Sequence, residues 1–125
     1  MTIQKALDLA DELKPNMMSR QTKIHFLDEI DKMIHGELVM THEHTAAEET
    51  VPSYDTDTDE GTELIIPGPY DMLYVYWLMS KIDELNQETD KYNNDRARFE
   101  TEYEQASDWW TRKRHPIQRT REFML

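Results

Sequence analysis

Two short stretches of the sequence bring together side chains that ligate metals. The stretch "DTDTDEG" at 55–61 alternates three aspartates, as the start of a calcium-binding EF-hand loop does. In such a loop a glycine directly follows the third aspartate, and a bidentate glutamate closes the site. Here Glu60 stands in the place of the glycine and Ile66 in the place of the closing glutamate. Because both diagnostic positions differ, we interpret the stretch as a solvated acidic turn.

The second stretch, "HEH" at 42–44, contains two histidines that are two residues apart. The zinc-protease motif needs two histidines four residues apart on one helix, with a glutamate after the first. His42 and His44 instead suit opposite faces of a helix or one face of a strand, and no third ligand is evident. We therefore expect no metal site and no bound cofactor.

Sequence motifs for catalysis are missing as well. The chain has no cysteine, which excludes a thiolate nucleophile and a disulfide framework. Its three glycines, at positions 36, 61 and 68, are too scattered to build a phosphate-binding loop or a nucleophile elbow. Pairs of carboxylates carry no signal, because 26 acidic residues produce such pairs by chance. The sequence therefore predicts a protein that is not an enzyme.

Charge is distributed unevenly along the chain. The 125 residues, which fit one domain, carry a net charge of −12. Residues 112–125 hold five lysines and arginines and one acid, whereas residues 1–111 hold 25 acids and 9 lysines and arginines. The acidic body argues against wrapping nucleic acid, which needs cations opposite the phosphates. The basic end suits an acidic protein surface, and the alternative is a terminus that is merely solvated.

Neither a membrane span nor a secretion signal is evident. The longest apolar run, 72–79, has 8 residues, whereas a transmembrane helix needs about 20. The start of the chain is amphipathic and acidic, unlike a signal peptide. The lack of cysteine agrees with a reducing compartment. We therefore expect no membrane partner.

Helical spacing of apolar residues accounts for the first 40 residues. A first amphipathic helix is predicted over 3–13, with Thr2 as its N-cap and Pro15 as its stop. A second apolar stripe covers 24–38, and Ser19 can cap this helix by accepting a backbone N–H.

Residues 42–68 break the helical pattern. They mix polar residues with two prolines and two glycines. Two short extended pieces, near 50–54 and 63–66, flank the acidic turn. This pattern predicts a loose hairpin or a projecting loop.

The third helix is predicted to carry most of the core. Pro69 can occupy its first turn, and the run over 72–79 is apolar almost all round, so every side must be covered. Val75 and Met79 are expected to meet a neighbouring helix or a second subunit. The main bundle core is expected to consist of Tyr74, Trp77, Leu78 and Ile82.

A bend at 86–88 separates this helix from a fourth one, which must end before Pro116. Trp109 is expected at the margin of its apolar face or on the surface, since adjacent helical residues point about 100° apart. Burial of Trp109 against the tail or the loop is the alternative. The aromatic seam is expected to comprise Tyr92, Phe99, Tyr103, Ala106 and Trp110, and the ion pairs to be Arg96–Glu100 and Arg98–Glu102.

Three stretches carry a resemblance to a known family. They are "ALDLADELKPN", "FLDEIDKMIHGELVMTHE" and "LIIPGPYDMLYVYWLMSKIDELNQETDKYNNDRARFETEYEQASDWW". Together they resemble the small head–tail connector proteins (head completion or adaptor proteins) of tailed bacteriophages and prophages. The resemblance implies a structural virion protein that is made in the host cytoplasm and forms a homo-oligomeric ring under the portal. It also implies that DNA passes through the lumen without specific binding, and that the next connector, stopper or tail protein docks below.

The expected architecture is an all-α four-helix bundle. A helical adaptor domain is expected over 1–114, with the loop or small β-hairpin of 42–68 projecting from it and an extended basic arm over 115–125. The surface expected to contact a second subunit or another partner comprises Val75, Met79, Trp109, Arg112, Lys113, Arg114, Ile117, Arg119, Arg121, Phe123 and Leu125. The alternative function is a small regulatory or antitoxin-like binding protein whose basic tail folds on its partner.

Overall fold

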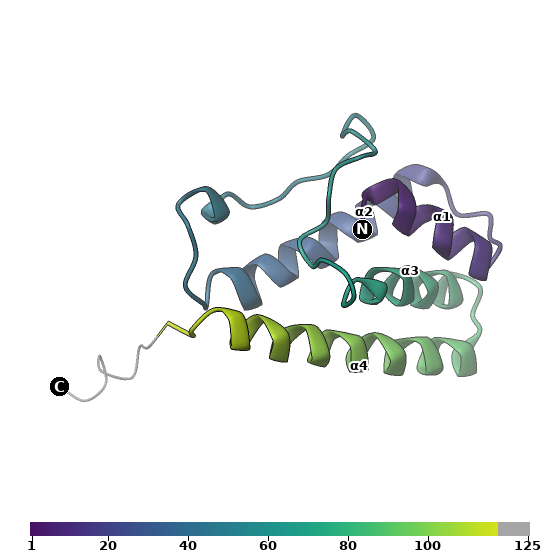
Figure 1. Cartoon of the computed structure of the whole chain (residues 1–125). Coiled ribbons are helices and arrows are strands. Elements are labelled where there is room, and N and C mark those ends of the chain that lie inside the picture. Colours follow the sequence, from purple (N-terminus) through teal and green to yellow (C-terminus); the bar gives the residue numbers. More distant parts are fainter. Residues whose placement is uncertain (118–125) are drawn as a thin grey trace.

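A computed structural model describes residues 1–117 of the chain. This part is all-α, as predicted, and it contains no β-strand (Figure 1). The long helices are α1 (Ile3–Leu13), α2 (Arg20–Ile34), α3 (Met72–Leu85) and α4 (Thr89–Lys113). A π-helical turn, η1 (His35–Val39), extends α2, and a 3-10 turn, η2 (Ala47–Glu49), interrupts the connection to α3. Within residues 1–117 no helix has the length and apolar content needed to cross a membrane.

Local signals fix where the helices begin and end. The Thr2 hydroxyl accepts the Lys5 backbone N–H at 3.1 Å, and the Ser19 hydroxyl accepts the Thr22 N–H at 3.1 Å. Each bond satisfies a donor that the first helical turn leaves free, so both predicted N-caps are confirmed. The bend between α3 and α4 is confirmed as well, and Gln87 adopts a φ of 56° there.

Helix α3 lies along α4 and also contacts α1 and α2 (Figure 1). Its predicted core residues Tyr74, Trp77, Leu78 and Ile82 are all buried. Val75 and Met79, which were expected to meet a neighbouring helix or a second subunit, are only 0% and 6% exposed within the subunit. Neighbouring helices therefore cover this face of α3, as the first of the two alternatives had it.

A buried carboxylate on α2 organises the connection that precedes α3. The Asp31 carboxylate accepts hydrogen bonds from the Tyr54 and Tyr74 hydroxyls, both at 2.6 Å, and from the Ile65 backbone N–H at 3.1 Å. The Tyr74 hydroxyl in turn accepts the Ile66 N–H at 2.8 Å. Burial raises the pKa of the Asp31 carboxyl, while hydrogen bonds from the two tyrosines oppose the shift. These contacts attach both ends of the acidic turn to the helical body.

The predicted hairpin does not form in residues 42–68. The segment near Glu63 makes an isolated antiparallel bridge with Thr2 instead, because the start of the chain supplies the hydrogen-bonding edge. The Ile3 N–H donates to the Thr62 carbonyl at 3.0 Å. Pro69 also lies outside α3, which begins three residues later, so its predicted place in the first turn is wrong.

A second buried polar cluster joins α1, α3 and α4. Lys14 donates hydrogen bonds to the carboxylates of Asp83 and Asp95, and the bond to Asp95 is 2.8 Å long. Arg98 lies 3.7 Å from Asp95, so its predicted pair with Glu102 is wrong, because the buried carboxylate is one turn away on the other side. The predicted pair of Arg96 and Glu100 is confirmed at 3.1 Å.

The two aspartates of this cluster differ in their protonation. Burial and the adjacent Asp95 carboxyl raise the pKa of Asp83 from 3.8 to about 6. Burial acts in the same direction on Asp95, but hydrogen bonds from Asp83 and Lys14 outweigh it and lower the pKa of Asp95. The pair therefore favours a proton on Asp83 and a charge on Asp95.

Replacing Trp77 by alanine tests the core assignment. The indole is 7% exposed, packs 5.0 Å from the Phe99 ring and donates its N–H to the Phe26 carbonyl at 3.0 Å. Trp77→Ala should lower the free energy of unfolding by about 3–5 kcal/mol, as measured by chemical denaturation. Gln105→Ala, at an exposed position of α4, is the matched control and should change it by less than about 0.5 kcal/mol. Equal midpoints for the two variants would contradict the assignment.

The aspartate pair predicts opposite pH dependences for two matched variants. Because the folded state raises the pKa of Asp83, this residue contributes stability below about pH 4 that is lost as the pH rises through about 6. The difference in the free energy of unfolding between the native chain and Asp83→Asn should therefore fall between about pH 4 and pH 6. The same difference relative to Asp95→Asn should instead rise with pH, and this rise should be complete by about pH 5, since the pKa of Asp95 lies below its usual value of 3.8. Urea unfolding between about pH 2 and pH 7 measures both differences, and parallel slopes would refute the assignment.

Candidate functional site

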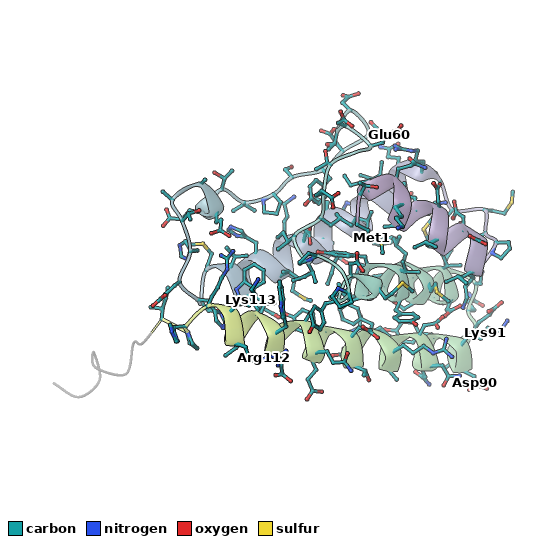
Figure 2. The ribbon with its side chains drawn as sticks, viewed as in Figure 1. Met1, Glu60, Asp90, Lys91, Arg112 and Lys113 are labelled. Atoms are coloured by element: carbon teal, nitrogen blue, oxygen red, sulfur yellow. The ribbon has the colours of Figure 1, made fainter. Side chains whose placement is uncertain are left out.

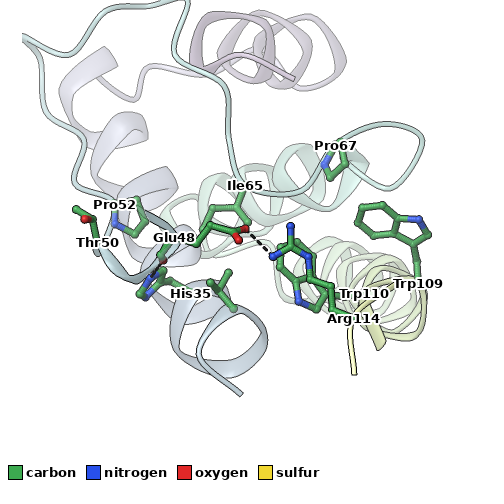
Figure 3. A pocket seen from close by; sticks show the side chains of 10 residues that line it. His35, Glu48, Thr50, Pro52, Ile65, Pro67, Trp109, Trp110 and Arg114 are labelled. Atoms are coloured by element: carbon green, nitrogen blue, oxygen red, sulfur yellow. Dashed lines mark hydrogen bonds and ion pairs between the residues drawn. The ribbon is translucent and has the colours of Figure 1, made fainter. Parts of the chain in front are cut away.

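A pocket of about 340 Å³ opens beside the C-terminal end of α4 (Figure 3). Its walls come from η1, from the connection between η1 and α3, and from the last turns of α4. We call it the tryptophan pocket and define it by Val39, Thr50, Pro52, Ile65, Trp109, Trp110 and Arg114. The lining is mainly apolar, with a few polar groups at the margin, which is typical of binding sites.

The two tryptophans play different structural parts. Trp110 is buried, whereas Trp109 is half-buried and stacks on Tyr70 with 5.2 Å between ring centres. The two indoles meet nearly at right angles, with 6.0 Å between their centres. The expected position of Trp109 at the margin is therefore confirmed. The Trp110 indole N–H is buried and has no hydrogen-bond partner among the described residues.

Arg114 forms one edge of the pocket and holds the opposite wall. Its guanidinium donates to the Glu48 carboxylate at 2.6 Å and lies 4.6 Å from the centre of the Trp110 ring (Figure 3). Hydrogen bonds from the Thr45 backbone and from Arg114 lower the pKa of Glu48. His35 donates its Nε2 proton to the Glu48 carbonyl at 2.8 Å. The η2 turn is therefore attached both to η1 and to the C-terminal end of α4.

The other predicted interface residues lie close to this pocket or outside the described residues. Arg112 and Lys113 are exposed at the same end of α4 (Figure 2), and the Lys113 ammonium lies 5.2 Å from the centre of the Trp109 ring. Ile117 is 39% exposed. The predictions for Arg119, Arg121, Phe123 and Leu125 fall outside the residues that the structure describes.

The chain remains attached to the body after α4. The Glu43 N–H donates to the His115 carbonyl at 2.9 Å, and the Ile117 N–H donates to the Thr41 carbonyl at 2.8 Å. Residues 115–117, which were predicted to begin an extended arm, therefore pair with 41–43 of the same subunit.

Both histidines of the "HEH" stretch are used in local hydrogen bonds. His42 donates from Nδ1 to the Leu38 carbonyl at 2.8 Å and accepts the Thr111 hydroxyl on Nε2 at 3.0 Å. His44 bonds the His42 carbonyl through Nδ1 at 2.7 Å. Residues 1–117 contain no group of three histidines and carboxylates placed to hold a metal ion.

The acidic turn uses its carboxylates on its own backbone. Asp55 accepts the Asp57 N–H at 2.8 Å, and Asp59 accepts the Gly61 N–H at 2.7 Å. These bonds are the Asx-type contacts that shape tight turns.

Sequence reasoning identified only the α4 side of the pocket. Glu48, Thr50, Pro52 and Ile65 come from a segment without periodicity, so no pattern marks them as pocket residues. Arg114 and its partner Glu48 are separated by 66 residues, and only the folded chain brings them together.

Removing the Arg114 guanidinium should loosen the pocket without unfolding the subunit. Arg114→Ala loses the ion pair and the contact with Trp110, and because both charged side chains are about a third exposed, the cost should be only about 1 kcal/mol. The tryptophan emission should shift to the red as water reaches Trp110. Arg114→Lys keeps the positive charge and is the matched control. Unchanged emission in Arg114→Ala would show that the guanidinium does not shield the indole.

Comparison with known proteins gives no relative: no protein-family model, no curated protein and no solved structure matches this chain.

Proposed function

We propose that the chain is a structural head–tail connector subunit of a tailed bacteriophage or prophage. In this proposal a ring of subunits lies below the portal, extends the DNA channel and links the head to the next connector or tail protein. Each subunit is a four-helix bundle with a projecting loop and a C-terminal arm. The proposal rests on the resemblance of the three long stretches and on the position of charge in the fold.

The observation that carries the proposal is the separation of acidic and basic surface. Two exposed cations, Arg112 and Lys113, lie where α4 ends. Figure 2 shows both of them far from Asp90, which lies at the start of α4. The sequence that follows adds further cations, whereas residues 1–111 carry a large excess of acids. A subunit of this kind presents one basic end to a partner and an acidic surface elsewhere.

An acidic body suits a channel through which DNA moves. Carboxylates do not replace the counterions of the phosphates, so such a wall does not hold the duplex. Glu60, at the tip of the projecting connection, is exposed, and so are most acids of the loop (Figure 2). The DNA therefore passes without specific contacts.

The basic end suits an acidic groove on the portal. Beyond the bridge at 115–117, the sequence adds Arg119 and Arg121 as cations and Phe123 and Leu125 as apolar side chains. An acidic groove with an apolar floor would complement both classes of side chain.

A second function has one observation in its favour. The tryptophan pocket beside a basic end is also what a small regulatory or antitoxin-like protein needs to bind one partner. Sizing at high concentration separates the two functions, because a connector gives a closed ring and a regulator gives a monomer or dimer.

Truncation after Ile117 tests the portal contact. The truncated chain keeps the hydrogen bonds of 115–117 to 41–43, so its helical content and thermal midpoint should stay unchanged. It should fail to join heads that bear the portal, as measured by co-sedimentation with purified heads. Undiminished binding would show that residues 118–125 do not make the contact. Loss of helical content would show instead that these residues pack on their own subunit.

A further inference from the structure

Large exposed hydrophobic side chains gather at two places in the described part of the chain. Leu13, Met17 and Leu85 are 54%, 100% and 64% exposed, and they lie where α1 and α3 end. We call these three residues the methionine knob. The other two exposed side chains, Val51 and Ile117, flank the tryptophan pocket or follow α4.

The turn that carries Met17 is held in a fixed shape. The Asn16 amide donates to the Asp11 carboxylate and to the Lys14 carbonyl, both at 2.9 Å, and its oxygen accepts the Met18 N–H at 3.0 Å. Met18 points inward and is buried at 9% exposure, so the turn presents Met17 outward. Because hydrogen bonds already hold the backbone of this turn, little backbone entropy is lost when the exposed Met17 side chain binds a partner.

The knob and the pocket lie at opposite ends of the subunit. Helix α4 has 25 residues and is therefore about 37 Å long. The knob lies near its start, because Leu85 directly precedes the bend at 86–88 and Lys14, next to Leu13, bonds Asp95 of α4. The pocket lies beside the end of α4, where Trp109 and Trp110 line it, and Figure 2 labels Asp90 and Lys113 at these two ends of the helix. Two different patches at opposite ends make head-to-tail contacts, which close into a ring when the rotation per subunit allows it.

Exposed charges at the two ends are complementary. Glu12 and Glu84 directly precede the knob residues Leu13 and Leu85, are exposed and make no ion pair within residues 1–117. Arg112 and Lys113 beside the pocket are also exposed and have no ion pair within the same residues. Opposite charges around an apolar contact favour the correct orientation of two copies and disfavour contacts between like ends.

The pocket chemistry fits a thioether side chain. Its walls are two indoles and the apolar surfaces of Val39, Pro52 and Ile65. Methionine is flexible enough to fill an irregular cavity, and its sulfur makes favourable contacts with aromatic rings. We infer that the methionine knob of a second copy of this chain occupies the tryptophan pocket, with Met17 as the central side chain. This inference rests on the proposed ring for its biological meaning and supplies the contact that builds it.

Cross-linking tests the contact directly, because the chain has no cysteine of its own. Met17→Cys places a thiol on the knob, and Thr50→Cys places one on the exposed margin of the pocket. A short bis-maleimide reagent should give covalent dimers when the two variants are mixed and none when either variant is treated alone. Gln105→Cys, at an exposed position between the two ends of α4, replaces Thr50→Cys as the matched control and should give no mixed product.

Each other pattern of products overturns the inference. Dimers of Met17→Cys alone indicate contact between two knobs, and dimers of Thr50→Cys alone indicate contact between two pockets. Equal yields with the Gln105→Cys control indicate random collision. A lack of mixed product at the highest attainable concentration shows that another molecule or none occupies the pocket.

A charge substitution measures the strength of the same contact. Met17→Asp should weaken self-association by roughly tenfold or more, since a buried methionine is replaced by a carboxylate. The thermal midpoint of the isolated subunit should not change, because Met17 touches solvent only. Sedimentation velocity over a concentration series gives the dissociation constant, and an unchanged constant overturns the inference. Thr101→Asp, at an exposed position in the middle of α4, introduces the same charge and is the control; it should associate as the native chain does.

Failure of the contact and failure of the proposed function give different results. If heads that bear the portal bind the chain but no mixed product forms, the contact is wrong and the connector function stands. If the mixed product forms but the heads do not bind the chain, the contact stands and the connector function fails.

Discussion

The Asp31 carboxylate joins three parts of the chain, which are α2, α3 and the connection between them. It lies on α2, it accepts a hydroxyl from α3 through Tyr74, and it receives two donors from the connection through Tyr54 and Ile65. A buried charge is costly unless hydrogen bonds satisfy it, so these three donors are a condition for the fold and not an addition to it. The path of residues 50–66 over the helices depends on this group, and so does one wall of the tryptophan pocket, to which Ile65 belongs.

The Lys14 cluster performs a similar task at the other end of the subunit. Lys14 follows α1, and its two aspartates lie near the end of α3 and in α4, so the three elements are joined next to the bend. Two residues of the methionine knob flank Lys14: Leu13 directly precedes it and Met17 follows it by three residues. Each candidate contact surface is therefore supported by its own buried polar group, which keeps irregular backbone in one shape where helix packing alone does not.

Much of the helical framework was predictable from local signals, whereas the long-range polar contacts were not. Thr2 and Ser19 are N-cap residues that mark where two helices begin. Tyr74, Trp77 and Ile82 show the apolar spacing of a buried helix. Of the two alternatives for 42–68, the hairpin does not form, because an extended piece near Glu63 does not specify its partner, which is the segment at Thr2. For Val75 and Met79 the spacing likewise showed that a face is apolar, but it could not decide between a neighbouring helix and a second subunit as its cover. On the site, Trp109 and Arg114 were identifiable by type, and Glu48 was not.

The short pairing between 41–43 and 115–117 determines how the subunit bears tension. Its hydrogen bonds, from Glu43 N–H to the His115 carbonyl and from Ile117 N–H to the Thr41 carbonyl, connect the chain after α4 to the chain after η1. A pull on residue 118 is therefore shared between two segments, and the last turn of α4 does not carry it alone. His42, between the two paired residues, is itself hydrogen-bonded to the Leu38 carbonyl of η1, so the second segment is anchored to the turn that extends α2.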